Sequence, residues 1–268
     1  MTTTTDSRCI FCRSCTRGTV SEEHVIPESL GNVSHVLPPG IVCDKCNNYF
    51  ASKVEKPVLN SPRFRVIRGM QEIPNKRKRF PFVNGMASCG IPIEFHRERK
   101  TGTPHIVIPE GSGDALFNHV EKTGTGRFYL PTDSTPPPKK LFSRFLGMVA
   151  VEAMALRLIG NREHLTNFID DDQLDVIREH ARRGTTADWP FNERRIYSQD
   201  ADVIHEFDFL VTPESEMYFV LAIFGLEFAI NVAGPTIDGY QKWLRENGDQ
   251  SPLYAGKNQF ARPPIIAE

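Results

Sequence analysis

The sequence predicts an α+β protein in which a small cysteine-rich module precedes a larger domain of mixed helices and strands. Five of its six cysteines lie among the first 50 of 268 residues, which is typical of a small module held by a metal ion. Farther along the chain, apolar residues first repeat at helical spacing and then alternate as in strands. Helices and strands that are segregated in this way favour an α+β domain.

The composition is that of an ordinary globular protein, with 24% charged and 40% hydrophobic residues. A formal net charge of −1 provides no global attraction for a polyanion. Residues 1–7 are polar and lack the apolar segment of a secretory leader. The apolar runs at residues 145–151 and 218–226 are too short to span a membrane. We therefore expect a cytoplasmic protein with no membrane partner, whose cysteines bind metal or stay reduced.

Two pairs of closely spaced cysteines predict a structural zinc site. Cys9 and Cys12 form the first pair, and Cys43 and Cys46 form the second, thirty residues farther on. Zinc takes four sulfur or imidazole ligands at tetrahedral corners, and each C-x2-C turn provides two adjacent corners. Cys15 is an alternative ligand, because Cys12 and Cys15 have the same spacing. We favour Cys9 and Cys12, the pair that encloses two apolar residues.

The segment between the cysteine pairs carries a second pattern. It reads Glu22-Glu23-His24-Val25-Ile26-Pro27 and then Leu30-Gly31, and Asn47 directly follows the second pair. An acid-His-[IV]-x-P segment, a Leu-Gly pair and a C-x2-C-[HN] motif occur in this order in the zinc-containing HNH endonucleases. Residues 9–55 therefore resemble that family over about a fifth of the chain. The resemblance implies a zinc-stapled ββα-metal (HNH) module at the N-terminus.

The resemblance also implies catalytic roles. In the family the histidine activates the attacking water, so His24 corresponds to the general base, a role that suits a group with a pKa near neutrality. The residue before this histidine, usually Asp, and the residue after the second cysteine pair, often His, bind the catalytic metal. Here these positions hold Glu23 and Asn47, whose oxygens suit Mg²⁺ or Mn²⁺. Glu22 is the alternative ligand, and His35 is the alternative base.

One family position has no clear counterpart in this sequence. The family carries a middle Asn shortly before the second cysteine pair, where Pro38-Pro39-Gly40 stand here. Asn32 and Asn48 are the two candidates for its orienting role.

Changes in composition divide the chain into three segments. We expect the module at residues 1–58, a basic Pro- and Gly-rich segment with strands at 59–135, and an α+β domain at 139–268. Between residues 60 and 100, ten Lys or Arg oppose three Glu, and four of them are consecutive: Lys76, Arg77, Lys78 and Arg79. Such a run contacts the phosphate backbone of DNA, unless it is only a solvated surface. Strand-like pieces occur at Gly90–Phe95 and His105–Pro109.

The C-terminal domain begins after a stiff connector of three prolines at residues 136–138. Apolar residues at spacings of three, four and seven predict a helix over Lys139–Ile159. A second helix is expected around Gln173–Arg183. Residues 163–216 hold fourteen Asp or Glu against five Arg, so we expect this acidic region to face away from DNA or to dock a protein.

Alternating side chains predict a small sheet near the C-terminus. A strand is expected at residues 203–211, with His205 packed on its apolar face. A turn then leads to a second strand at 217–224, and a third strand follows at 226–232. No site chemistry is visible in these strands.

The leading functional hypothesis is a metal-dependent endonuclease that hydrolyses phosphodiester bonds in DNA, in restriction or phage defence. One alternative is a catalytically inactive zinc module that binds nucleic acid, which the Glu23 and Asn47 differences from the usual family residues favour. Another is a subunit of a larger defence or repair assembly, with the C-terminal domain recruiting a protein partner. The oligomeric state and the choice of DNA over RNA are left open by the sequence.

Overall fold

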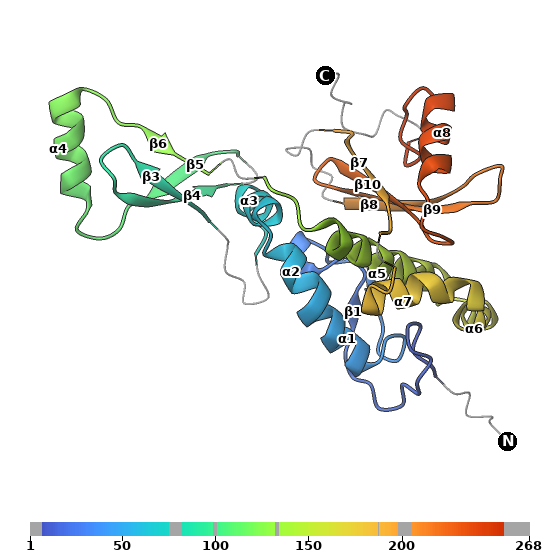
Figure 1. The fold of residues 1–268 in the computed structure, drawn as a ribbon. Helices are drawn as coiled ribbons and strands as arrows, with labels where there is room; N and C mark the ends of the chain where they lie inside the picture. Colours follow the sequence, from blue (N-terminus) through green and yellow to red (C-terminus); the bar gives the residue numbers. More distant parts are fainter. Residues whose placement is uncertain are drawn as a thin grey trace. The chain divides into compact units, whose positions relative to one another are not determined.

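The computed structural model describes residues 7–74, 82–98, 101–131, 134–186, 188–197 and 205–254. Contacts divide the chain into two units, each described here by itself (Figure 1). The first unit combines residues 1–27, 32–58 and 138–268, and the second combines 28–31 and 59–137. The first unit thus joins the N-terminal module to the C-terminal segments of the chain, with most of the second unit inserted between them.

The N-terminal module is a short hairpin followed by a helix. Strands β1 (Glu23–His24) and β2 (Val36–Leu37) pair antiparallel, with Glu23 opposite Leu37 and His24 opposite Val36. Helix α1 (Asp44–Phe50) continues through the π-helical turn η2 (Ala51–Glu55) into α2 (Lys56–Leu59). Asp44 in the first turn of α1 complements the positive end of the helix dipole. This is the ββα order that the sequence implied.

Three helices form the layer beside the module. They are α5 (Lys139–Leu158), α6 (Arg162–Asp170) and α7 (Asp175–Arg183), with the 3₁₀ turn η3 (Asp172–Leu174) between the last two. The predicted helices at 139–159 and 173–183 are therefore confirmed as α5 and α7 with η3. Gly147 lets α5 and α7 pack closely, since a Cβ there would lie 2.9 Å from Cδ1 of Ile177. No helix in the described part of the chain is long and apolar enough to cross a membrane.

Four antiparallel strands form the C-terminal sheet. In spatial order they are β7 (Phe191–Arg195), β10 (Leu226–Asn231), β9 (Met217–Ile223) and β8 (His205–Val211). The predicted hairpin and third strand are confirmed, while Val203 and Ile204 lie outside the described residues. Gly225 forms the β9–β10 turn at φ +79°, where a Cβ would lie 2.0 Å from the Tyr197 carbonyl oxygen.

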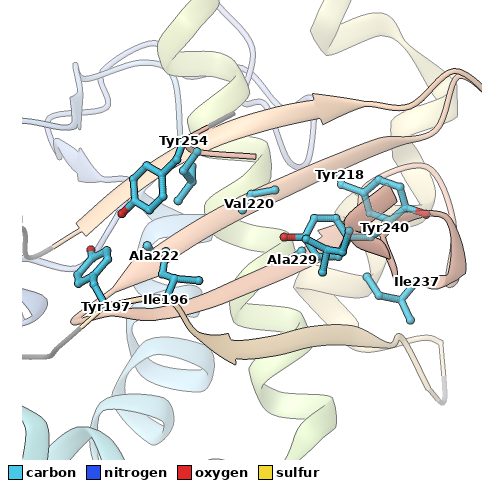
Figure 2. Close-up of a cluster of buried hydrophobic side chains, with 11 residues drawn as sticks. Ile196, Tyr197, Tyr218, Val220, Ala222, Ala229, Ile237, Tyr240 and Tyr254 are labelled. Carbon is cyan, nitrogen blue, oxygen red and sulfur yellow. The ribbon is translucent and has the colours of Figure 1, made fainter. Parts of the chain in front are cut away.

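Both faces of this sheet are covered. On one face Phe142 of α5 packs edge-on against Phe228 of β10, with ring centroids 4.7 Å apart. On the other face, helix α8 (Asp238–Glu246) contributes Tyr240 to a buried cluster with β9 and β10 residues, including Tyr218 and Ala229 (Figure 2). The sheet is thus the middle layer between α5 and α8.

The second unit contains a four-stranded antiparallel sheet and two helices. The sheet order is β5 (Pro104–Val107), β4 (Pro92–Arg97), β3 (Val83–Ala87) and β6 (Phe128–Tyr129). The helices are α3 (Pro62–Met70) and α4 (Gly113–Thr123), and the 3₁₀ turn η1 (Glu28–Leu30) belongs to the same unit. Strands β4 and β5 confirm the two predicted strand-like pieces with shifted ends. Lys76, Arg77, Lys78 and Arg79 lie outside the described residues.

Two arginines dock the N-terminal module on the helical layer. Arg8 donates hydrogen bonds of 2.6 and 2.8 Å to the carboxylate of Asp170. Arg13 donates to the carbonyl of Ile169 at 2.8 Å and to Oδ2 of Asp175 at 3.1 Å. Part of the acidic region therefore binds two arginines of the same chain's N-terminal module.

Arg13→Ala is expected to lower the free energy of unfolding by about 1–2 kcal/mol, because it removes charge-assisted hydrogen bonds across this contact. Urea unfolding at constant zinc would measure the change. The control is Arg183→Ala, which removes an exposed pair with Glu179 inside α7 (3.3 Å) and should change stability by less than about 0.5 kcal/mol. Equal effects of the two variants would contradict the docking role of Arg13.

Candidate active site

Four thiols of the N-terminal module converge on one point. The sulfur atoms of Cys9, Cys12, Cys43 and Cys46 all lie within 4.8 Å of one another. Those of Cys12 and Cys43 are 3.6 Å apart. Sulfurs bound to a tetrahedral zinc ion at about 2.3 Å stand about 3.8 Å from each other, so this spacing fits zinc. Cys15, the alternative ligand, is exposed and does not belong to the group.

Local backbone structure holds these thiols in place. The first pair lies in a tight turn, in which the Arg13 amide donates to the Cys9 carbonyl at 2.9 Å. Cys43 caps the N-terminus of α1, with its sulfur accepting from the Cys46 amide at 3.4 Å. The Cys43 amide donates to the Cys9 sulfur, also at 3.4 Å. Amide donors stabilise the thiolate, which is the form that binds zinc.

The thiols of Cys9 and Cys46 differ in acidity. The hydrogen bond from Cys46 lowers the pKa of the Cys9 thiol to about 5, against the opposing effect of burial. The pKa of Cys46 is raised, because its thiol donates that hydrogen bond and is itself buried. The Cys9 thiolate therefore forms readily, and a bound cation would favour ionisation of the Cys46 thiol as well.

Strand β1 places Glu23 and His24 on different sides of the hairpin. Glu23 is 5% exposed and faces inward, whereas His24 is only half-buried. Neighbouring side chains of a strand point to opposite faces, which explains the difference. His24 is thus partly exposed to solvent, whereas Glu23 is shielded from it.

Asn47 reaches the same strand from helix α1. Its Nδ2 donates a 3.2 Å hydrogen bond to the carbonyl of Glu22, the residue before Glu23. Donation through the nitrogen leaves the amide oxygen as the group that can bind a cation. Asp44, which the sequence analysis did not single out, also ties α1 to this segment by accepting from the Ser21 amide at 3.3 Å. The structure therefore ties Asn47 to the backbone of the residue that precedes Glu23.

Asn32 fixes the loop between β1 and β2. Its side-chain nitrogen donates to the carbonyls of Ile26 and His35 at 2.7 and 2.9 Å. Its side-chain oxygen accepts from the amides of Ser34 and His35 at 3.1 and 2.9 Å. Asn32 is fully buried, whereas Asn48 is exposed. Of the two candidates for an orienting Asn, Asn32 is the one that holds the hairpin loop.

The alternative site residues lie elsewhere. Glu22 is exposed, with its side chain away from the interior. His35 is half-buried and packs edge-on against Phe207 of β8, with ring centroids 4.9 Å apart. Burial lowers the pKa of His35. Its packing against the C-terminal sheet indicates a structural role.

One buried acid near the site was not predicted from the sequence. Glu152 lies in α5 with no exposed surface. The signal that marks it is an acidic residue inside an otherwise apolar helical stretch, where a charge is costly unless it has a partner.

Comparison with known families is consistent with this geometry. Residues 9–62 match the model of a family described as HNH endonuclease. The chain therefore has an N-terminal HNH domain, and its four clustered cysteines fit a zinc knuckle. Domains of this family are generally nucleases that use divalent metals and act on nucleic acid. No curated protein and no solved structure matches the chain.

The wild-type protein is expected to hold one zinc ion per chain, and Cys12→Ser is expected to lose it, because three thiols do not complete the tetrahedron. Cys15→Ser is the matched control and should retain the metal. Elemental analysis of purified protein measures both. Loss of zinc in the Cys15 variant would assign the first ligand pair to Cys12 and Cys15 instead of Cys9 and Cys12.

Asn32→Ala should destabilise the protein by about 2–4 kcal/mol, because it leaves buried backbone donors and acceptors without partners. Chemical unfolding measures this loss. Asn48→Ala, at an exposed helical position, should change stability by no more than about 0.5 kcal/mol. A neutral Asn32 variant would show that the loop is held by other contacts.

Proposed function

We propose that the protein is a metal-dependent endonuclease that hydrolyses phosphodiester bonds in DNA. The observation that supports the proposal is the HNH domain itself: a half-buried His24 lies on a hairpin to which Asn47 hydrogen-bonds at the Glu22 carbonyl, and four thiols cluster in the same module. Hydrolysis requires a base for the attacking water and a cation for the charge on the phosphate. His24, Glu23 and Asn47 are of the residue types that this chemistry needs.

In the proposed reaction His24 removes a proton from water as the water oxygen attacks the phosphorus atom. The bond to the 3′ oxygen breaks, and that oxygen takes up a proton from solvent water. Glu23 and Asn47 would hold one Mg²⁺ or Mn²⁺ through their oxygens, and this cation would supply the positive charge that offsets the developing negative charge. The thiol cluster serves the structure only, because four sulfur ligands leave zinc no open position for substrate.

The biological setting belongs to the same proposal. A DNA endonuclease of this kind suits restriction or phage defence in the cytoplasm. The basic run Lys76–Arg79 is proposed to contact the phosphate backbone, because four adjacent cations displace condensed counterions. The C-terminal domain is proposed to recognise DNA or a protein partner.

A second candidate is a zinc module that binds nucleic acid without cutting it. The specific observation in its favour is the burial of Glu23, which is 5% exposed and therefore poorly placed for a cation at the surface. A protein that binds DNA but leaves it intact with Mg²⁺, Mn²⁺ and Ni²⁺ would support this candidate.

His24→Ala is expected to reduce plasmid cleavage by about 10²- to 10⁴-fold, the usual contribution of a general base, while zinc content and melting temperature stay unchanged. The matched control is His164→Ala, an exposed histidine of α6, which should cleave like the wild type. Wild-type cleavage rates in the His24 variant would refute the assignment of the base.

A further inference from the structure

Basic side chains of three helices meet on one surface of the first unit. Arg144 of α5 donates a 2.8 Å hydrogen bond to the hydroxyl oxygen of Tyr49 on α1. It also donates to the carbonyls of Ala181 and Arg182 in the last turn of α7, at 3.1 and 2.7 Å. This one guanidinium therefore joins the helix of the HNH domain to α5 and α7, which contact each other along the layer (Figure 1).

A second cation of α5 lies directly beside Arg144. Lys140 is four residues earlier in the helix and is exposed. A Cβ on Gly184, which ends α7 in the left-handed conformation, would lie 3.0 Å from Cε of Lys140 and 3.0 Å from Cδ of Arg144. The two side chains thus lie together over the end of α7. Burial, and then the positive charges of Arg144 and Lys140, lower the pKa of the buried His180 to about 4, which agrees with this placement.

The end of α7 adds two arginines to this charge. Arg182 and Arg183 both pair with the carboxylate of Glu179, each at 3.3 Å, so one acid faces two cations. Cations near the C-terminus of a helix are stabilised by its dipole. The dipole of α7 thus accounts for part of the charge, but the charge continues on α1, where a different end of the helix is concerned.

Positive charge runs along the exposed side of α1. Lys45 and Tyr49 are four residues apart and so lie on the same side of the helix, and Lys53 follows on η2. All three are exposed. Lys45 stands in the first turn of α1, where a cation opposes the helix dipole. Within the described part of the chain, no carboxylate forms an ion pair with Lys45, Lys53 or Lys140. Local helix stability therefore does not explain these lysines.

We infer that this basic surface binds the phosphate backbone of duplex DNA. Like charges that are gathered without neutralising acids repel one another, and a polyanion removes that repulsion. Lysine, arginine and tyrosine side chains are common donors to phosphate oxygens. The basic surface is formed by Lys45, Tyr49, Lys53, Lys140, Arg144, Arg182 and Arg183.

Two arguments favour DNA over an acidic protein as the partner. The family that residues 9–62 match acts on nucleic acid, and the basic surface includes the helix of that domain. The choice of DNA over RNA rests on the proposed function. The inference then gives the C-terminal domain, whose role in recognition is proposed above, a defined contact with DNA through α5 and α7.

The basic surface is separate from the proposed catalytic residues. Asn47 is two residues from Lys45 and two from Tyr49, and residues two apart do not face the same side of a helix. Binding at the basic surface therefore does not require cleavage, and it can be measured without Mg²⁺ or Mn²⁺.

The test measures binding of a fluorescently labelled DNA duplex to the full-length, zinc-loaded protein by anisotropy, over a range of salt concentrations and without added Mg²⁺ or Mn²⁺. Each phosphate contact adds about 0.9 to the slope of log affinity against log salt, and so roughly 5-fold in affinity at about 0.15 M relative to about 1 M salt. Lys45→Gln with Lys140→Gln should reduce the slope by about 2 and weaken binding by about 30-fold at about 0.15 M salt.

The matched control is Lys242→Gln with Arg245→Gln, which removes two exposed cations from α8, on the opposite face of the C-terminal sheet from α5. It changes the net charge equally and should bind the duplex like the wild type. Lys45→Gln alone, expected to lose about 5-fold, decides the matter if the double variant does not fold.

Four results would overturn the inference. They are wild-type affinity in the folded Lys45/Lys140 variant, an equal loss in the control, no duplex binding by the wild-type protein, and tighter binding of single-stranded RNA of the same sequence. An equal loss in the control would mean that only net charge matters.

Binding and cleavage can fail separately. Duplex binding that depends on Lys45 and Lys140 in a protein that never cuts DNA would support the basic surface and refute the proposed activity. Cleavage by a wild-type protein whose duplex affinity is unchanged in the Lys45/Lys140 variant would support the activity and overturn the basic surface.

Discussion

The convergence of four thiols is the constraint on which the N-terminal domain depends. The hairpin has only two residues in each strand, and an isolated hairpin of that size is not stable in water. Cys43 joins the cluster and also caps α1, so the same residue sets the metal frame and the start of the helix. A cation bound there would offset the chain entropy lost in closing the loop between the cysteine pairs. The positions of His24 and Asn47 then depend on the thiol cluster, because it fixes the hairpin and helix α1.

The sequence predicted best those features that depend on residues close together in the chain, namely the spacing of metal ligands and the periodicity of helices and strands. The spacing of the cysteine pairs predicted the four thiols that the structure brings together, and the apolar residues between Cys9 and Cys12 favoured Cys9 over Cys15. Helical spacing predicted α5, because a helix buried on most sides is marked by its apolar residues. The β8–β9 hairpin was predicted equally well from the turn at residues 212–216, and β10 from the alternating residues after Gly225.

Contacts between residues far apart in the sequence could not be predicted in the same way. The acidic segment after α5 looked like a surface for a partner, yet Asp170 and Asp175 bind arginines of the module more than 150 residues earlier. Asn32 could not be separated from Asn48 by sequence, since only the folded loop shows which amide has backbone groups around it. Glu152 was visible as a charge in an apolar stretch, but its nearness to Glu23 depends on how α5 packs against η2 and β2.

Most of the second unit lies between the N-terminal module and helix α5 in the sequence, so the first unit is completed late in synthesis. Residues 59–137 are synthesised between the module and helix α5, which packs against it. At about 5–20 residues per second, this interval delays the arrival of α5 by roughly 4–16 s after the last residue of the module is made. A nascent chain thus carries the histidine and the zinc ligands well before it carries Glu152. A chain that ends before residue 139 lacks helix α5 and therefore exposes the parts of β2 and η2 that α5 contacts in the full-length protein.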